Sequence, residues 1–121
     1  IDAYNANLSS MHAALQSFAQ TEDAHKMMIL GDMRELGTAS ADAHAEVLQL
    51  ALTTGSQQVW LVGNEFAQAL TTLPADKKVI FHTFPDVEAV KAELEAQPLN
   101  DQLILIKGSN GTRLFQLPEL L

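Results

Sequence analysis

The sequence of 121 residues contains no cysteine. This absence excludes disulfide bonds, zinc sites built from thiolates and cysteine nucleophiles, and it agrees with a reducing cytoplasm, where we expect the protein to act. The chain also lacks the features of a signal peptide, because it starts at Ile1 without an initiator methionine and without a charged segment ahead of an apolar one. We therefore expect the chain to open inside a longer protein.

Basic residues and long apolar runs are scarce. Seven Lys and Arg stand against fifteen Asp and Glu, which leaves a formal net charge of -8. Phosphate contacts need Lys and Arg, so nucleic acid and anionic membrane surfaces are poor partners for such a chain. The most apolar stretches, such as residues 59–62 and 103–106, fall far short of the ~20 residues that span a bilayer. The sequence predicts neither a nucleic-acid partner nor a membrane partner.

The size and apolar content are those of one globular domain. With 121 residues, of which 47% are hydrophobic, the chain is long enough to bury a working core. It contains no internal repeat, low-complexity tract or linker-like run. We expect residues 1–121 to form a single folding unit.

Short apolar runs alternate with segments of helical period along the whole chain. The strands expected from these runs cover residues 27–30, 59–62, 79–82 and 103–106, with the end of a further strand at 1–4. The helical stripes lie around residues 11–18, 44–52, 66–70, 87–94 and 112–117. Because the strand runs are apolar throughout, they indicate parallel strands that are buried on both faces. The pattern predicts an α/β fold, a three-layer Rossmann-like sandwich with a mostly parallel sheet of five to six strands.

Polar residues mark the starts and stops of these helices. Ser9 or Ser10 is expected to cap the first helix and Ser40 the second. Gly55 is expected to stop the second helix, and residues 83–86 are expected to open the fourth.

Ligands of an open parallel sheet bind beyond the carboxyl ends of its strands. This rule selects four polar segments, which are residues 4–7, 31–35, 63–65 and 107–111. In the last of them, Lys107 precedes Gly108 and Ser109, so a cation lies beside accessible backbone amides, which suits an anionic group.

Structural roles are an alternative for each of these residues. Glycines commonly end strands, a single loop lysine is usually solvated, and Asn5 and Asn7 are of the residue type that forms turns and N-caps. The four histidines have no metal-binding spacing, and His44 is expected to pack along its helix. The chain has no phosphate-binding loop, dinucleotide fingerprint or nucleophile elbow. Its residues alone predict an acidic α/β domain without a complete catalytic apparatus.

Three segments, in order and spread over the whole chain, resemble one known family. Residues 2–15 are similar to D-x-Y-N-A-N-P-x-S-M-x-A-A-L, and residues 30–37 are similar to L-G-D-M-x-E-L-G, followed at the expected distance by His44 and Val47. Residues 104–109 are similar to a third motif that ends in K-G-S. The three segments resemble the motifs of the C-terminal domain of the Mur ligase family, in its D-alanyl-D-alanine-adding (MurF) branch.

The resemblance implies an activity that this chain shares with other domains. Such ligases use ATP and Mg²⁺ to join D-Ala-D-Ala to UDP-N-acetylmuramoyl-tripeptide in bacterial peptidoglycan synthesis. The resemblance implies that residues 1–121 are the last of three domains, and that the N-terminal domain and the central ATP-binding domain are absent from this chain. The chain alone is expected to be inactive, because its task is to close over the ATP site and to help bind the dipeptide.

The resemblance also implies site residues. Asp2 is expected to face the ribose of ATP. The residues expected to help bind the substrate are Tyr4, Asn5, Asn7, Asp32, Glu35, Lys107, Gly108 and Ser109. Lys107 and Ser109 are expected to meet the carboxylate of D-Ala-D-Ala or the acyl phosphate. The alternative for Lys107 is that it points into solvent or pairs with Asp32 or Glu35. No metal ligand is expected in this chain.

Some positions depart from the family pattern. Leu8 stands where the family usually has Pro, and Asn110 stands where Arg commonly follows K-G-S, with Arg113 three residues further on. The sequence also allows two alternatives to the ligase domain. One is a stand-alone α/β module that binds a small molecule, and the other is a structural domain without a ligand. An upstream phosphate-binding loop in the same reading frame would favour the ligase.

Overall fold

Four parallel strands form one sheet in the part of the chain that the structure, a computed structural model, describes, namely residues 7–109 and 113–114. The strand order is β3-β2-β1-β4. The strands are β1 (Lys26–Gly31), β2 (Gln58–Val62), β3 (Phe81–Phe84) and β4 (Leu103–Lys107). The helices are α1 (Leu8–Gln20), α2 (Ser40–Ala51), α3 (Asn64–Leu70) and α4 (Val87–Ala96), with short 3-10 turns at Gly37–Ala39 and Ala75–Lys77.

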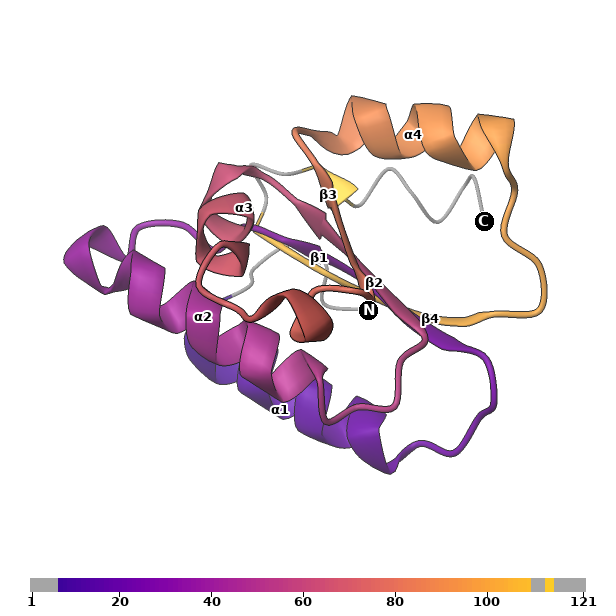
Figure 1. The fold of residues 1–121 in the computed structure, drawn as a ribbon, viewed down its shortest axis with the longest axis horizontal. Helices are drawn as coiled ribbons and strands as arrows, with labels where there is room; N and C mark the ends of the chain where they lie inside the picture. Colours follow the sequence, from indigo (N-terminus) through magenta and orange to yellow (C-terminus); the bar gives the residue numbers. More distant parts are fainter. Residues whose placement is uncertain (1–6, 110–112, 115–121) are drawn as a thin grey trace.

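Helices cover both faces of this sheet, as the predicted three-layer α/β sandwich requires. Figure 1 shows α1, α2 and α3 on one side of the strands and α4 on the other. The described part holds four strands, fewer than the five to six that were predicted. The strand expected at residues 1–4 and most of the helix expected at 112–117 lie outside the described residues.

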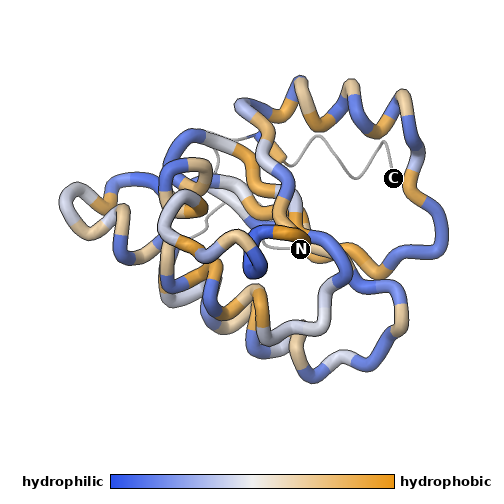
Figure 2. The backbone as a smooth tube through the Cα atoms, viewed as in Figure 1, coloured by the Kyte–Doolittle hydropathy of each residue, from blue (hydrophilic) through white to orange (hydrophobic). Residues whose placement is uncertain are grey.

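The core is divided in two by the alternation of side chains along the strands. Met28 and Leu30 of β1 face α1, α2 and α3, whereas Met27 and Ile29 of the same strand face α4. All six residues of β1 are buried, and residues 27–30 among them form a continuous apolar run that does not alternate with polar residues. Figure 2 shows the same concentration of hydrophobic residues along the central strands. Among the described helices, none has the length and apolar character needed to cross a bilayer.

The register brings the carboxyl ends of the strands to one edge of the sheet. Gly31 of β1 pairs with Val62 of β2, and Leu30 pairs with Lys107 of β4. The segments that come after these strands therefore meet at this edge, as the sequence predicted.

Helix starts show where local sequence rules held and where they failed. Asp86 caps α4 as expected, because its Oδ1 accepts a hydrogen bond from the amide of Ala89 at 2.9 Å. The expectation that Ser9 or Ser10 caps α1 is wrong. The cap is Asn7, whose Oδ1 accepts from the amide of Ser10 at 2.9 Å, while the hydroxyl of Ser10 accepts from the amide of Asn7 at 3.0 Å. Ser10 is thus the reciprocal partner in a capping box.

Three further boundaries differ from the predictions. Ser40 is the first residue of α2 and not its cap, because the 3-10 turn Gly37–Ala39 leads into the helix with helical dihedral angles already at Ala39. Helix α2 ends at Ala51, and Gly55 comes after a further turn with φ of 77°. Strand β3 begins at Phe81, opposite Val59, two residues later than predicted, and Val79 ahead of it is 75% exposed.

Candidate functional site

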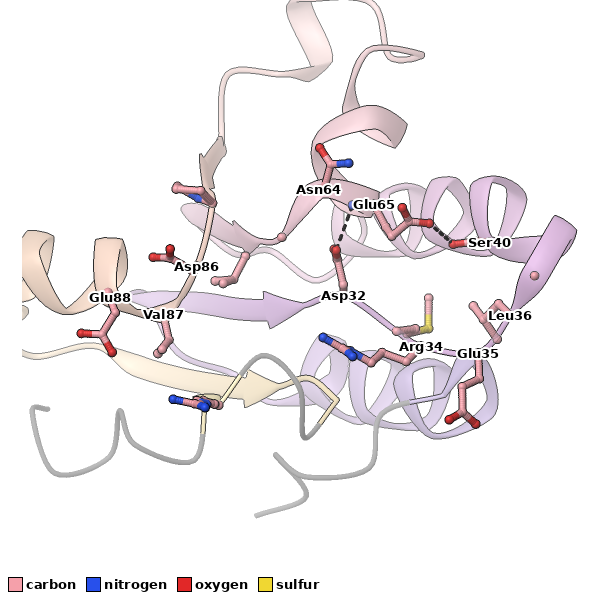
Figure 3. Close-up of a pocket in the computed structure, with 16 residues that line it drawn as sticks. Asp32, Arg34, Glu35, Leu36, Ser40, Asn64, Glu65, Asp86, Val87 and Glu88 are labelled. Atoms are coloured by element: carbon pink, nitrogen blue, oxygen red, sulfur yellow. Dashed lines mark hydrogen bonds between the residues drawn. The ribbon is translucent and has the colours of Figure 1, made fainter.

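A pocket of about 790 Å³ lies at the carboxyl edge of the sheet (Figure 3). Its wall comes from the loop after β1, the end of β2 with the start of α3, and the start of α4. Arg113 completes the described lining. The residues of the wall are 32–37, Ser40, 62–65 and 85–88. The segment 30–37, which carries the second motif, thus supplies one side of the pocket.

Asp32 holds two neighbouring elements together at this edge. Its carboxylate accepts hydrogen bonds from the backbone amides of Glu65 at 2.8 Å and Phe66 at 2.9 Å, and so caps α3 from outside the helix. Figure 3 shows the Asp32 side chain pointing towards Glu65. Gly63 makes this approach possible, because it has φ of 117° and a Cβ there would overlap Oδ2 of Asp32. The role of Asp32 in substrate binding stays a prediction.

Two arginines from separate segments line the pocket. Arg34 belongs to the loop after β1, and Arg113 lies just beyond the third motif; both are exposed. Neither guanidinium forms an ion pair or a side-chain hydrogen bond with another described residue. Both positive charges are therefore available to a ligand that carries a carboxylate or a phosphate.

Most carboxylates of the pocket wall are engaged within the protein. Besides Asp32, Glu65 accepts from the hydroxyl of Ser40, Asp86 caps α4, and Glu88 lies 3.4 Å from the ammonium of Lys91. Glu35 is exposed, has φ of 62°, and has no such partner among the described residues. The pocket thus presents two cations and one unengaged carboxylate to a ligand.

Lys107, Gly108 and Ser109 are buried beside the pocket and do not line it. Lys107 is 3% exposed and Ser109 is 6% exposed. The amide of Ser109 donates to the carbonyl of Asp32 at 3.4 Å, so this turn packs against the end of β1. The alternative that Lys107 points into solvent is wrong, because neighbouring elements cover it. Its contact with an anionic substrate group stays a prediction.

The structure therefore brings only part of the predicted site together. Asp32 and Glu35 line the pocket, while Asn7 lies at the start of α1 and caps it. Asp2, Tyr4 and Asn5 lie outside the described residues.

Residues 85–88, at the start of α4, form one side of the pocket that was not predicted from the sequence. From the sequence, residues 83–86 were interpreted only as a helix start. The signal was present: β3 ends at Phe84, so the rule that selected the other strand ends applies to this strand as well.

Comparisons with known proteins agree with the motifs. The family described as "Mur ligase, glutamate ligase domain" matches residues 1–110. UDP-N-acetylmuramoyl-tripeptide--D-alanyl-D-alanine ligase of Treponema pallidum is 35% identical over 100% of this chain and 27% of its own length. The Escherichia coli ligase of the same name is 31% identical over 96% of this chain and 25% of its own. The chain thus spans about a quarter of these relatives.

Solved structures show the same likeness. A crystal structure of MurF from Acinetobacter baumannii superposes with a TM-score of 0.74 and 29% identity, over 97% of this chain and 26% of that one. MurF ligase from Thermotoga maritima in complex with ADP has a TM-score of 0.67 at 19% identity, covers 98% of this chain and 26% of its own, and shares the fold. The family match over most of the chain confirms the resemblance seen in the three motifs: the chain belongs to the Mur ligase, glutamate ligase domain family.

Proposed function

We propose that this chain is the C-terminal domain of an ATP-dependent ligase that joins D-Ala-D-Ala to UDP-N-acetylmuramoyl-tripeptide in peptidoglycan synthesis. In this proposal the chain works with an N-terminal and a central domain of the same protein in the cytoplasm. It closes over the ATP site of the central domain and helps bind the dipeptide. One observation carries the proposal: the loop 32–37, from the motif shared with these ligases, forms a wall of the pocket at the sheet edge.

The chemistry of the dipeptide matches what the pocket offers. D-Ala-D-Ala has a carboxylate at one end and an amine at the other. Arg34 and Arg113 supply positive charge for the carboxylate, and Glu35 supplies a carboxylate that accepts hydrogen bonds from the amine. Recognition by fixed charges of both signs favours one orientation of the dipeptide, with its amine directed to the reacting centre.

The reaction needs an enclosed site more than it needs further catalytic groups from this domain. ATP phosphorylates the terminal carboxylate of the tripeptide, and the amine of D-Ala-D-Ala attacks the acyl phosphate to form an amide and release phosphate. Water would hydrolyse that intermediate, so a domain that closes over it protects the reaction. In this proposal Asp2 faces the ribose, and Tyr4, Asn5 and Asn7 help bind the dipeptide at the junction between the domains. The turn of Lys107, Gly108 and Ser109 meets the carboxylate or the acyl phosphate.

ATP and Mg²⁺ are assigned mainly to the central domain. In residues 7–109 and 113–114, no three His, Asp or Glu side chains are grouped so that they could hold a metal ion. We therefore assign no Mg²⁺ ligand to the described residues. When bound elsewhere, Mg²⁺ would neutralise the phosphate charge during transfer.

The test uses the full-length protein that carries this chain. We expect phosphate release from ATP that depends on both D-Ala-D-Ala and the UDP-linked tripeptide. Arg34→Met should raise the KM for D-Ala-D-Ala about ten-fold, because one charge-assisted hydrogen bond is lost. Lys77→Met, in the exposed turn Ala75–Lys77 ahead of β3, removes the same charge outside the pocket and is the matched control.

The alternatives predict different outcomes. If the full-length protein binds D-Ala-D-Ala but does not release phosphate from ATP, the result would favour a stand-alone binding module. A protein in which the pocket residues can be exchanged without effect on binding or turnover would be a structural domain.

A further inference from the structure

We propose that His44 is a positioning residue for the pocket, and that its ring sets the position of the loop 32–37 by holding the backbone of Met33. The inference rests on the proposed function, because it assigns His44 an effect on dipeptide use. His44 itself does not line the pocket. It lies in α2, eleven residues after Met33, and is fully buried.

Two hydrogen bonds use both ring nitrogens of His44. Nε2 accepts from the amide of Met33 at 3.0 Å, and Nδ1 lies 2.7 Å from the carbonyl oxygen of Ser40. A carbonyl only accepts, so Nδ1 must carry the proton, and an amide only donates, so Nε2 must be bare. The contacts therefore select a single neutral tautomer that links α2 to the loop.

The ring is also fixed from the side. The His44 ring packs edge-on against Phe66 of α3, with ring centroids 4.6 Å apart. The hydroxyl of Ser40, one turn before His44, donates to the carboxylate of Glu65. Helices α2 and α3 thus hold the histidine in one orientation, which is what a positioning group needs.

The backbone at Asp32 and Met33 is tied to three neighbouring segments. The amide of Asp32 donates to the carbonyl of Val62 at 3.0 Å, and its carbonyl accepts from the amide of Ser109 at 3.4 Å. The amide of Met33 donates to His44. Among these three backbone hydrogen bonds, only the one to His44 is made with a side chain, so a substitution outside the loop can remove it.

The next two residues of the loop are less constrained. Arg34 and Glu35 are exposed, and Glu35 has φ of 62°, in a region that non-glycine residues rarely occupy. The direction in which these two side chains enter the pocket depends on where the loop leaves Met33. A shift of that backbone by a fraction of an ångström therefore moves the groups that the proposed function assigns to the dipeptide.

The experiment compares two substitutions of His44 in the full-length protein. His44→Phe keeps a ring against Phe66 and removes both hydrogen bonds, whereas His44→Gln keeps an acceptor for the amide of Met33. We expect His44→Phe to lower kcat/KM for D-Ala-D-Ala about ten-fold or more, with the KM for ATP changed less than about two-fold. His44→Gln should recover most of that loss. Amide hydrogen exchange at Met33 should accelerate in His44→Phe and stay slow in His44→Gln.

A core variant at the other end of the sheet separates positioning from stability. Phe18→Leu changes a buried side chain of α1 that lies beside Lys26, at the start of β1, and it should lower Tm with no selective effect on the dipeptide. For each variant, the loss of kcat/KM for D-Ala-D-Ala is compared with the loss of kcat/KM for ATP. If His44→Phe lowers Tm and its two losses stand in the same proportion as those of Phe18→Leu, His44 is structural and the inference is overturned.

Two readouts keep this test independent of the proposed function. If the unsubstituted protein shows no turnover that depends on D-Ala-D-Ala, the proposed function fails, while Met33 exchange still tests the tie to His44. Should His44→Phe fail to fold, long-range proton–nitrogen correlation spectra of the unsubstituted chain show which ring nitrogen of His44 carries the proton. A ring protonated on Nδ1 with bare Nε2 supports the tie, and a proton on Nε2 contradicts it.

Discussion

The sequence allows two roles for Asn7, capping of α1 and binding of the dipeptide, and only its contacts distinguish them. Its side chain and that of Ser10 form a reciprocal capping box at the start of α1. The two bonds satisfy backbone donors that the first turn of a helix leaves without partners. Capping therefore accounts for Asn7 without a ligand, and the proposed role at the dipeptide has to be measured separately.

We predict that Asn7→Ala lowers the free energy of unfolding by about 1 kcal/mol, measured by urea denaturation, because α1 loses its cap. Asn7→Asp keeps an oxygen acceptor and should remain close to the unsubstituted chain. In the full-length protein, Asn7→Ala should leave kcat/KM for D-Ala-D-Ala unchanged if capping is its whole role. A selective loss of dipeptide use in this variant would restore the binding role.

The burial of Lys107 determines which substitution can test its role. With 3% of the residue exposed, truncation to alanine removes a buried aliphatic stem as well as a charge. A solvated lysine could be truncated with little effect on fold stability, but a buried one cannot. Lys107→Met keeps most of the volume and removes the charge, so it isolates the electrostatic role.

We predict that Lys107→Met in the full-length protein lowers kcat/KM for D-Ala-D-Ala by about ten- to a hundred-fold, because a charge-assisted hydrogen bond is lost. Lys107→Ala should show the same kinetic loss with an additional decrease in Tm. Steady-state kinetics at varied dipeptide concentration provides the measurement. Unchanged kcat/KM in Lys107→Met would contradict the anion-binding role.

At the scale of elements, the contact between Asp32 and the start of α3 fixes how β1, β2 and α3 meet. The two backbone amides that donate to Asp32 lie 33 and 34 residues away in sequence. The chain can bring them so close only because Gly63 has no side chain and adopts φ of 117°. The same contact forms part of the pocket wall, so a change in its geometry reaches the site.

We predict that Gly63→Ala lowers the free energy of unfolding by about 2 kcal/mol or more, because the methyl group both strains the backbone and displaces Asp32. Gly37→Ala is the matched control. Gly37 also has positive φ, at 57°, but a Cβ there meets no atom within 4 Å, so only the backbone strain of about 1 kcal/mol applies. Equal losses in the two variants, measured by chemical denaturation, would show that the approach of Asp32 contributes nothing.

The size and the net charge of the whole molecule limit what the chain can do alone. The family match covers residues 1–110, and the chain spans about a quarter of the length of the relatives that it matches. The proposed function assigns the groups that hold ATP to another domain, because this sequence has no phosphate-binding loop. Its formal charge of -8 also opposes binding to ATP, which is itself an anion.

We predict that the purified 121-residue chain neither releases phosphate from ATP in the presence of both substrates nor binds ATP tightly. Isothermal titration calorimetry and a phosphate-release assay provide the measurements. The full-length protein serves as the positive control under identical conditions. Phosphate release by the chain alone would overturn the division of labour between the domains.

The fold class, the central strands and the family could all be predicted from the amino-acid sequence. Continuous apolar runs have few ways to be buried other than as inner strands, so β1, β2 and β4 were predicted to within one residue at each end. The rule that ligands bind beyond the carboxyl ends of parallel strands also predicted the edge of the sheet at which the pocket lies, because these ends meet at one edge. Motifs carry this information locally, which is why the family was recognisable from short segments.

Which residues face the pocket depends on contacts between elements that are far apart in the sequence. Asp32 turns to the amides of α3, Lys107 is covered, and the start of α4 closes one wall. His44 is a further example: its packing along the helix was predicted, but its hydrogen bond to the amide of Met33 was not. Each of these outcomes depends on which element packs beside which, and on the few tenths of an ångström that separate a hydrogen bond from a clash. Sequence periodicity places a side chain on a face, whereas long-range packing determines what that side chain touches.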